Sequence, residues 1–245
     1  MHTFFLPAAS WHEPYQVTGA EARHLVTVLR IKQGETVRLL DGEGREGLFT
    51  VQTVEKRHVT LVPEKIISHD RPAGRATLAV GYGRGIRRGW LLEKAVELEA
   101  AGIWFWQADR SQGKVPEESK ETWLAQMTAG AKQSNNPWLP GLRTLPGGVA
   151  ELAAASKDFD KTFILWEGDT KGATLSMRDL SPGEGTPGRN TLFVLGPEGG
   201  FTEREIAALT AASCIPVSLG NRVLRWETAA VLCLGLTWWA RQQEL

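Results

Sequence analysis

The sequence predicts an α/β protein in which a small β-rich domain precedes a larger domain built on a parallel sheet. Short β-type segments fill the first 70 residues, whereas strands and helices alternate from Ala76 onward. That alternation is typical of parallel sheets covered by helices. Apolar residues make up 42% of the 245 residues, which is enough for a hydrophobic core and too many for a disordered chain.

The first 70 residues have the pattern of a small β-barrel. The expected strands are Thr36–Leu40, Leu48–Thr53 and Val59–Pro63. Residues 41–44 (DGEG) separate the first two strands and have the glycines and aspartate of a hairpin turn. Glu21–Arg30 has the apolar spacing of a helix. Short strands so close together favour a barrel, and Ser68–Gly74, with its proline and glycine, is the expected linker.

The rest of the chain alternates between apolar strands and helices. The expected strands are Ala76–Tyr82, Ile103–Trp106, Thr162–Trp166, Thr191–Leu195 and Ile215–Ser218. The expected helices are Trp90–Ala101, Glu117–Gln133, Thr202–Ala211 and Glu227–Ala240. Leu180–Asn190 is rich in glycine and proline and is expected to be a flexible connection. This order predicts a largely parallel sheet with helices on both faces.

The composition excludes several kinds of site. All five histidines lie within the first 69 residues, so the larger domain has neither a Ser-His-Asp triad nor a histidine-bound metal. Cys214 and Cys233 lack the spacing of a zinc site or a disulfide scaffold, so we expect no metal and a reducing cytoplasm. Residues 1–10 lack a secretory pattern, and the apolar run Ala229–Leu236 is too short to cross a bilayer.

The formal net charge is zero, and its distribution is only slightly uneven. Residues 1–90 contain 13 Lys and Arg against 9 Asp and Glu, whereas residues 91–245 contain 15 against 19. The excess of cations would direct any polyanion binding toward the N-terminal part. Statistical scatter explains the same difference.

Residues 195–205 (LGPEGGFTERE) carry the strongest local signal for a binding site. A strand ends, a glycine-rich loop follows, and Thr202 with Glu205 forms a capping box at the start of a helix. Glycines let the backbone approach a ligand closely, and ligands of open α/β sheets bind at the carboxyl ends of strands. The loop lacks the Gly-Lys-Ser/Thr of a phosphate-binding loop. Its Glu198 favours a ligand with positive charge, such as S-adenosylmethionine, although an ordinary strand–helix turn would look the same.

Residues 219–229 (LGNRVLRWETA) form a second glycine-bearing turn between a strand and a helix. Its Arg222 and Arg225 suit an RNA phosphate, or salt bridges with nearby acids such as Glu227. The helix that follows is apolar nearly all round, so it is expected in a core or in a subunit interface. We favour a dimer interface.

Together these two motifs resemble the C-terminal signature of the knotted SPOUT RNA methyltransferases. More narrowly, they resemble the ribosomal RNA small-subunit methyltransferase E family. Residues 24–30 (HLVTVLR) are similar to the N-terminal RNA-binding domain of that family, and residues 92–98 (LEKAVEL) to its first catalytic helix. Asn221 and Trp226 replace the proline and the small polar residue usual in the family, and residues 99–102 replace its Gly-Val.

The resemblance implies a PUA-like RNA-binding β-barrel at residues 1–70 and a SPOUT domain with a C-terminal trefoil knot at residues 74–245. It also implies S-adenosylmethionine as cofactor, 16S ribosomal RNA as partner, a homodimer, and methylation of N3 of a uridine. Carried over residue by residue, cofactor contacts fall on Leu165, Glu167, Gly168, Leu195, Gly196, Glu198, Gly199, Gly200, Leu219, Gly220, Val223 and Leu224.

Arg225 and Glu198 are the candidate catalytic residues, because both lie in the cofactor turns. Arg225 would stabilise charge on a uracil oxygen, and Glu198 would accept the proton of N3 or only fix its loop. The candidate RNA-binding residues are His24, Arg30, Lys32, Arg84, Arg87, Arg88, Arg110 and Arg222. The alternatives are a structural role for His24 and packing or ion pairing for Arg30. A solvated helix start explains Arg84, Arg87 and Arg88 as well. Alternative functions are methylation of a ribose 2′-hydroxyl and non-catalytic RNA binding in ribosome assembly.

Overall fold

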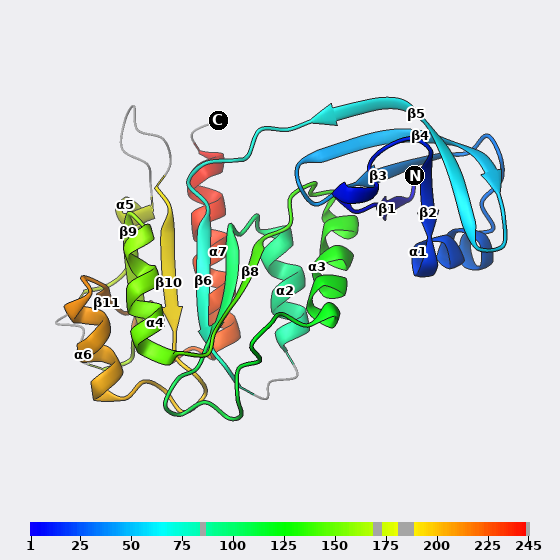
Figure 1. Cartoon of the computed structure of the whole chain (residues 1–245). Coiled ribbons are helices and arrows are strands. Elements are labelled where there is room, and N and C mark those ends of the chain that lie inside the picture. The colour runs from blue at the N-terminus through cyan, green and yellow to red at the C-terminus, as the bar shows by residue number, and fades with distance from the viewer. Residues whose placement is uncertain (84–86, 169–172, 181–188, 244–245) are drawn as a thin grey trace. The chain divides into compact units, whose positions relative to one another are not determined.

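The computed structural model describes residues 1–83, 87–168, 173–180 and 189–243 (Figure 1). The chain forms two compact units. The first contains Met1–Arg71 with Thr128–Leu139, and the second contains Pro72–Met127 with Pro140–Leu245. Residues 128–139 therefore pack with the N-terminal segment although they lie far along the chain.

The first unit is built on a five-stranded sheet in the order β1-β3-β4-β5-β2. Its strands are β1 (Thr3–Phe5), β2 (Tyr15–Thr18), β3 (Thr36–Leu40), β4 (Arg45–Val54) and β5 (His58–Ser68). The β1–β3 pair is parallel and the others are antiparallel. Register shifts in the β4–β5 pair increase the twist, so the long strands curl around a core that includes Phe4, Leu25 and Phe49 (Figure 1).

The predicted hairpin turn at residues 41–44 is confirmed. Gly42 and Gly44 have φ angles of 83° and 99°, which only glycine adopts without strain. The buried Asp41 carboxylate accepts the backbone N–H groups of Glu43 and Arg45 at 2.7 and 2.8 Å. The side chain of Trp138 packs on Gly44, so the turn also holds residues 128–139 in this unit.

The helical stretch predicted at Glu21–Arg30 is present in two parts. An α-helix, α1 (Gly19–Arg23), continues as a π-helical segment, η2 (His24–Leu29). The stretch ends at Arg30, whose φ of 52° is left-handed. Strands β1 and β2 were not expected from the sequence, because they are only three and four residues long.

The second unit contains a six-stranded sheet in the order β11-β9-β10-β6-β7-β8, and every pair in it is parallel. The strands are β6 (Ala76–Gly81), β7 (Gly102–Trp106), β8 (Gly141–Leu145), β9 (Lys161–Leu165), β10 (Thr191–Leu195) and β11 (Ile215–Val217). The predicted α/β class with a parallel sheet is confirmed. Strand β8 was missed because it is a half-exposed edge strand without an apolar run.

Helices cover both faces of this sheet (Figure 1). They include α2 (Arg88–Glu97), α4 (Gly148–Ala155), α5 (Met177–Leu180), α6 (Glu203–Ala211) and α7 (Trp226–Gln242). Helix α3 (Glu121–Ser134) begins in this unit, and its residues from Thr128 belong to the first unit. Helices α4 and α6 pack together on one face, and α2 packs against α7 on the other. Helix α2 ends at Glu97 rather than at the predicted Ala101, because Glu99 turns the chain with a φ of 54°.

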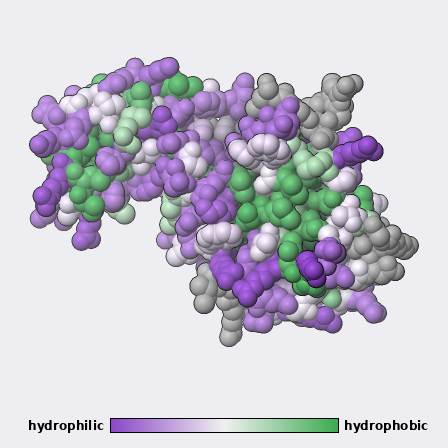
Figure 2. Space-filling view, turned by 180° about the vertical axis from the view of Figure 1, so that it is seen from behind, coloured by the Kyte–Doolittle hydropathy of each residue, from purple (hydrophilic) through white to green (hydrophobic). Residues whose placement is uncertain are grey.

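Strand β10 lies between β6 and β9, and all five of its residues are buried. Such a strand is apolar throughout because helices cover both of its faces. Helix α7 packs on β6 and β10 and buries Ala230, Cys233 and Leu234. Its Leu232 and Trp239 are exposed by 37% and 54%. A cluster of hydrophobic residues is visible on the face seen from behind (Figure 2). The knot and the dimer stay predictions. In the described part of the chain, no helix has the length and apolarity to span a bilayer.

We predict that Gly81→Ala destabilises the second unit by about 1–3 kcal/mol, the usual effect of overpacking. A Cβ at Gly81 would overlap the backbone nitrogen of Pro197. Urea unfolding followed by circular dichroism measures the change. The matched control is Gly83→Ala, because a Cβ there meets no described atom within 4 Å. Equal stability of the two variants would contradict the prediction.

Candidate functional site

A cavity of about 1120 Å³ opens at the carboxyl ends of β9, β10 and β11. Its walls come mainly from the turns after these three strands, at residues 165–167, 195–201 and 217–225. Strand order reverses beside β6 and β10, since β7 and β8 lie to one side and β9 and β11 to the other. Open α/β sheets bind ligands at such a reversal, so the position suits a binding site.

The cavity brings together most of the predicted site. The predicted cofactor residues that line it are Leu165, Glu167, Leu195, Gly196, Glu198, Gly199, Gly200, Leu219, Gly220, Val223 and Leu224. Gly168 is not among the lining residues. Both catalytic candidates line the cavity, and so do two predicted RNA-binding residues, Arg87 and Arg222.

Sequence reasoning gave no site role to several other lining residues. They are Pro197, Phe201, Val217, Ser218, Asn221, Trp226, Glu227 and Ala229. Most of them are next in the chain to a residue that was predicted to bind the cofactor. Extending the prediction to the neighbouring residues of the two motifs would have included them. The aromatic rings of Trp166, Phe201 and Trp226 give this cavity apolar surface beside its polar loops.

Close packing shapes the first glycine turn, residues 196–200. Gly200 has a φ of 71°, and its N–H donates to the carbonyl oxygen of Pro197 at 2.8 Å. A Cβ on Gly196 would lie 3.1 Å from the ring of Phe201. The turn therefore exposes backbone rather than side chains to the cavity, except for the exposed Glu198.

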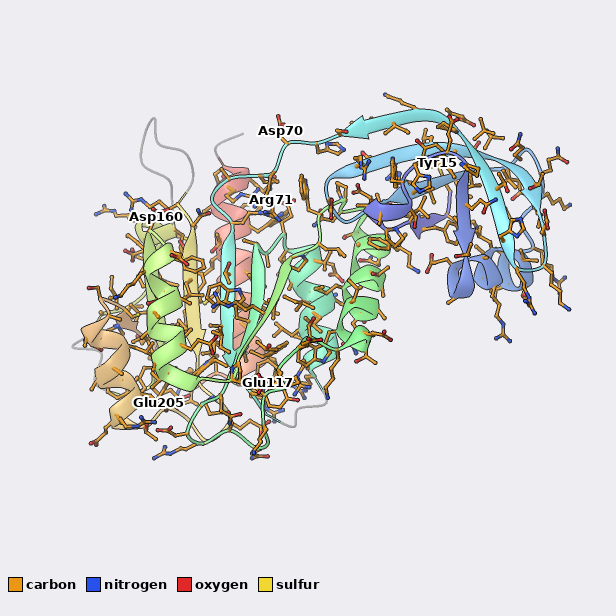
Figure 3. All side chains as sticks on the ribbon, viewed as in Figure 1. Tyr15, Asp70, Arg71, Glu117, Asp160 and Glu205 are labelled. Atoms are coloured by element: carbon orange, nitrogen blue, oxygen red, sulfur yellow. The ribbon has the colours of Figure 1, made fainter. Side chains whose placement is uncertain are left out.

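The predicted capping box at Thr202 is confirmed. The Thr202 hydroxyl accepts the N–H of Glu205, and the Glu205 carboxylate accepts the N–H of Thr202 at 2.8 Å. Glu205 is fully buried and also accepts the N–H of Asp109 at 2.8 Å. Figure 3 shows Glu205 at the N-terminal end of α6, toward the edge where the strands end.

The loop after β7 supports the glycine turn from outside. Arg110 donates from Nη1 to the carbonyl oxygens of Gly199 and Phe201 at 3.0 and 3.2 Å. Hydrogen bonds from Arg204 and Thr202 hold the pKa of the Asp109 carboxyl below its usual value. Arg110 was predicted to bind RNA, and in the structure its guanidinium holds the turn.

The second turn, residues 218–225, is fixed at both ends. Ser218 pairs with the backbone of Ala173 and Leu175 at 2.9 and 3.0 Å, and the Arg225 carbonyl accepts the first hydrogen bond of α7, from Ala229. Between them Gly220 has a φ of 122°. Residues 221–223 are exposed, so the middle of the turn is free to meet a ligand.

Glu227 forms an ion pair with Arg87 rather than with Arg222 or Arg225. The Glu227 side chain is 8% exposed and that of Arg87 is 53% exposed. Arg87 precedes α2 and Glu227 lies in the first turn of α7, so the pair joins the starts of two helices at the cavity wall. The sequence also allowed a salt bridge between Glu227 and Arg222 or Arg225, and that alternative is wrong.

Of the other predicted RNA-binding residues that the structure describes, none is among the residues that line the cavity. Arg88 stacks on the ring of Tyr82 at 4.4 Å and donates to the carbonyl oxygen of Gly83, so a packing role is evident. Arg84 lies outside the described residues. In the first unit, His24, Arg30 and Lys32 are exposed. The described residues contain no cluster of three metal-ligating side chains.

Comparison with known proteins identifies the family. The family described as RNA methyltransferase domain matches residues 69–238, which is more than half of the chain. The chain belongs to this family. A second family, described as RNA methyltransferase PUA domain, matches residues 17–64. The predicted family and the predicted PUA-like start are therefore confirmed, and the protein is an RNA methyltransferase.

Relatives of this RNA methyltransferase share one name. "Ribosomal RNA small subunit methyltransferase E" of Bacillus subtilis (strain 168) is 28% identical over 225 residues, covering 90% of this chain and 88% of that protein. The protein of the same name from Mycobacterium bovis is 29% identical over 228 residues, covering 89% of this chain and 84% of that protein.

Solved structures have the same fold. A putative methyltransferase from Legionella pneumophila, in complex with the bound cofactor SAM, is 26% identical with a TM-score of 0.82, covering 97% of each chain. A probable rRNA-methyltransferase from Porphyromonas gingivalis gives a TM-score of 0.84 at 23% identity, covering all of both chains. The second likeness shows the fold alone.

We predict that Glu205→Ala destabilises this methyltransferase by about 2 kcal/mol. The change removes a capping box and leaves the N–H groups of Thr202 and Asp109 without their buried acceptor. Thermal unfolding measures the loss. Glu203→Ala, in the same turn of α6 but exposed, is the control. If Glu205→Ala had the same melting temperature as this control, Glu205 would not stabilise the start of α6 and the loop after β7.

Proposed function

We propose that this RNA methyltransferase transfers a methyl group from S-adenosylmethionine to N3 of a uridine in 16S ribosomal RNA. One observation carries the proposal: the two glycine-bearing turns predicted to bind the cofactor line the same cavity. The curated relatives named for the small-subunit RNA support the choice of substrate, because they match along nearly the whole chain. The solved relative with bound SAM supports the choice of donor.

The residues of the cavity fit S-adenosylmethionine. Backbone groups of residues 196–200 and 219–220 offer hydrogen bonds without bulky side chains, and Trp166 and Phe201 offer apolar surface to an adenine ring. Glu167 and Glu198 provide negative charge for a ligand that carries a sulfonium and an ammonium. Leu165, Leu195, Leu219, Val223 and Leu224 complete the proposed contacts.

When bound, S-adenosylmethionine supplies a methyl group that is already activated for displacement. The protein therefore has to orient the base and deal with the proton on N3. Arg225 lines the cavity at the N-cap of α7, where its guanidinium stabilises the negative charge that develops on a uracil oxygen. Glu198 lines the opposite turn and accepts the proton.

The RNA itself is held by exposed cations. His24, Arg30 and Lys32 are each exposed in the first unit, and Arg222 is exposed at the cavity. Such residues bind phosphates by charge rather than by sequence. A second copy of the chain covers the exposed side chains of Leu232 and Trp239 on α7, because a homodimer would remove this apolar surface from water. The substrate places the enzyme in the cytoplasm.

We expect the purified protein to convert uridine to 3-methyluridine in unmodified small ribosomal subunits. Nucleoside digestion and mass spectrometry identify the product, and calorimetry measures the affinity for S-adenosylmethionine. A 2′-O-methylated nucleoside would contradict the assignment of N3. Failure to bind S-adenosylmethionine would remove the cofactor assignment.

Arg225→Ala should lower kcat about 100-fold, the effect of losing one donor to a developing oxyanion. Glu198→Gln should lower kcat about 10–100-fold, because an amide cannot accept the proton. Neither change should alter the melting temperature, since both side chains are exposed. Glu203→Gln, outside the cavity on α6, is the control. Undiminished turnover in either variant removes that residue from the mechanism.

A further inference from the structure

One wall of the cavity is not used by the proposed cofactor contacts. Arg87, Trp226 and Glu227 line it, and they come from the starts of α2 and α7 rather than from the glycine turns. The cavity, at about 1120 Å³, is comparable with the largest small-molecule pockets, whose typical range is about 300–1,000 Å³. This space suits a second ligand beside the cofactor.

The Glu227 carboxylate fixes one side of this wall. It is 8% exposed and paired with Arg87, and a buried carboxylate is stable only when it is paired or hydrogen-bonded. Glu227 is held by the first turn of α7, whereas the Arg87 side chain is about half-exposed. The carboxylate therefore orients the guanidinium, which remains partly open to the cavity.

The chemistry of this pair favours a neutral base over a phosphate. A guanidinium has five N–H donors and stays charged at every working pH, and only Nη1 is directed at Glu227. The nearby carboxylate cancels much of the positive charge, so the pair attracts a phosphate weakly. A uracil ring is neutral when it binds and gains negative charge on its oxygens only as N3 loses its proton, which is when a fixed donor is most effective.

We propose that Arg87, Trp226 and Glu227 form the subsite for the target uracil. Arg87 donates a hydrogen bond to a uracil carbonyl oxygen and stabilises the anion, and Glu227 is the positioning residue that holds Arg87. The half-buried ring of Trp226 offers a face on which the flipped base stacks. This inference rests on the proposed function, and it assigns Arg87 to the base instead of the phosphate contact expected from the sequence.

The test compares kcat, KM and their pH dependence for wild type, Arg87→Ala, Arg87→Lys and Glu227→Gln on unmodified small ribosomal subunits. Arg87→Ala should lower kcat about 100-fold at saturating substrate and move the plateau of kcat to higher pH, because the base must ionise without help. Arg87→Lys should restore part of kcat. Glu227→Gln should lower kcat about 10-fold with the same shift in pH, since the guanidinium loses its charged partner.

The stacking role has its own variants. Trp226→Ala should raise KM about 10-fold, the size of one base-stacking contact, whereas Trp226→Phe should keep KM within about twofold because it keeps an aromatic face. Arg178→Ala, an exposed arginine on α5, is the matched control and should behave as wild type. Calorimetry should give S-adenosylmethionine affinities near that of wild type for all variants.

Two results would overturn the subsite. The first is an Arg87→Ala protein with unchanged kcat and pH profile but a raised KM and a weaker salt dependence, which is the behaviour of a phosphate contact. The second is equal KM for Trp226→Ala and wild type. A wild-type protein that forms no 3-methyluridine would instead refute the proposed function, so the two failures are distinguishable. If Arg87→Ala does not fold, the variants Arg87→Lys, Trp226→Ala and Trp226→Phe still test whether these residues bind the target uracil.

Discussion

The site depends on how closely the backbone of β6 approaches the turn that follows β10. These strands are neighbours in the parallel sheet, and Gly81 at the end of one touches Pro197 after the other. Any side chain at that position would push the turn away from the sheet edge. Because the turn carries Gly196, Gly199 and Gly200, this contact sets where the backbone donors of the cavity lie.

A network on the outer side keeps the same turn in place. Glu205 joins the start of α6 to the loop after β7 through the N–H groups of Thr202 and Asp109. Arg110, from that loop, reaches the carbonyl oxygens of the turn. Buried charged groups are stable when all their hydrogen bonds are made, so the glycine turn is rigid although its own residues have little side chain to pack.

Charge in the cavity is balanced but unevenly exposed. Three carboxylates and three guanidiniums line it, from Glu167, Glu198, Glu227, Arg87, Arg222 and Arg225. Only Glu227 among them is buried. The exposed charges on the turns are screened by salt, whereas the buried Glu227 carboxylate at the start of α7 gives the Arg87 guanidinium a fixed direction. The cavity thus combines exposed charges near the glycine turns with one preset donor at the starts of α2 and α7.

The sequence by itself determined the larger pattern of this protein. Alternating strands and helices predicted the parallel sheet, because burial on both faces requires apolar strands such as β10. The two glycine motifs predicted the cavity walls. Glycine positions and a capping box depend on residues close together in the chain, so their spacing can be read from the sequence. Short edge strands such as β8 escaped prediction, because three to five half-exposed residues carry too weak a pattern.

Only the tertiary structure decided which side chains meet. Arg87 and Glu227 are 140 residues apart in the chain. The local sequence around Glu227 is equally compatible with an ion pair to Arg87 and an ion pair to the nearer Arg225. Arg110 and Gly199 are likewise 89 residues apart, so the hydrogen bonds by which Arg110 holds the turn follow only from the packed sheet. Sequence spacing fixes neighbours along one element, whereas contacts between elements follow from the strand order, which places distant segments at one edge.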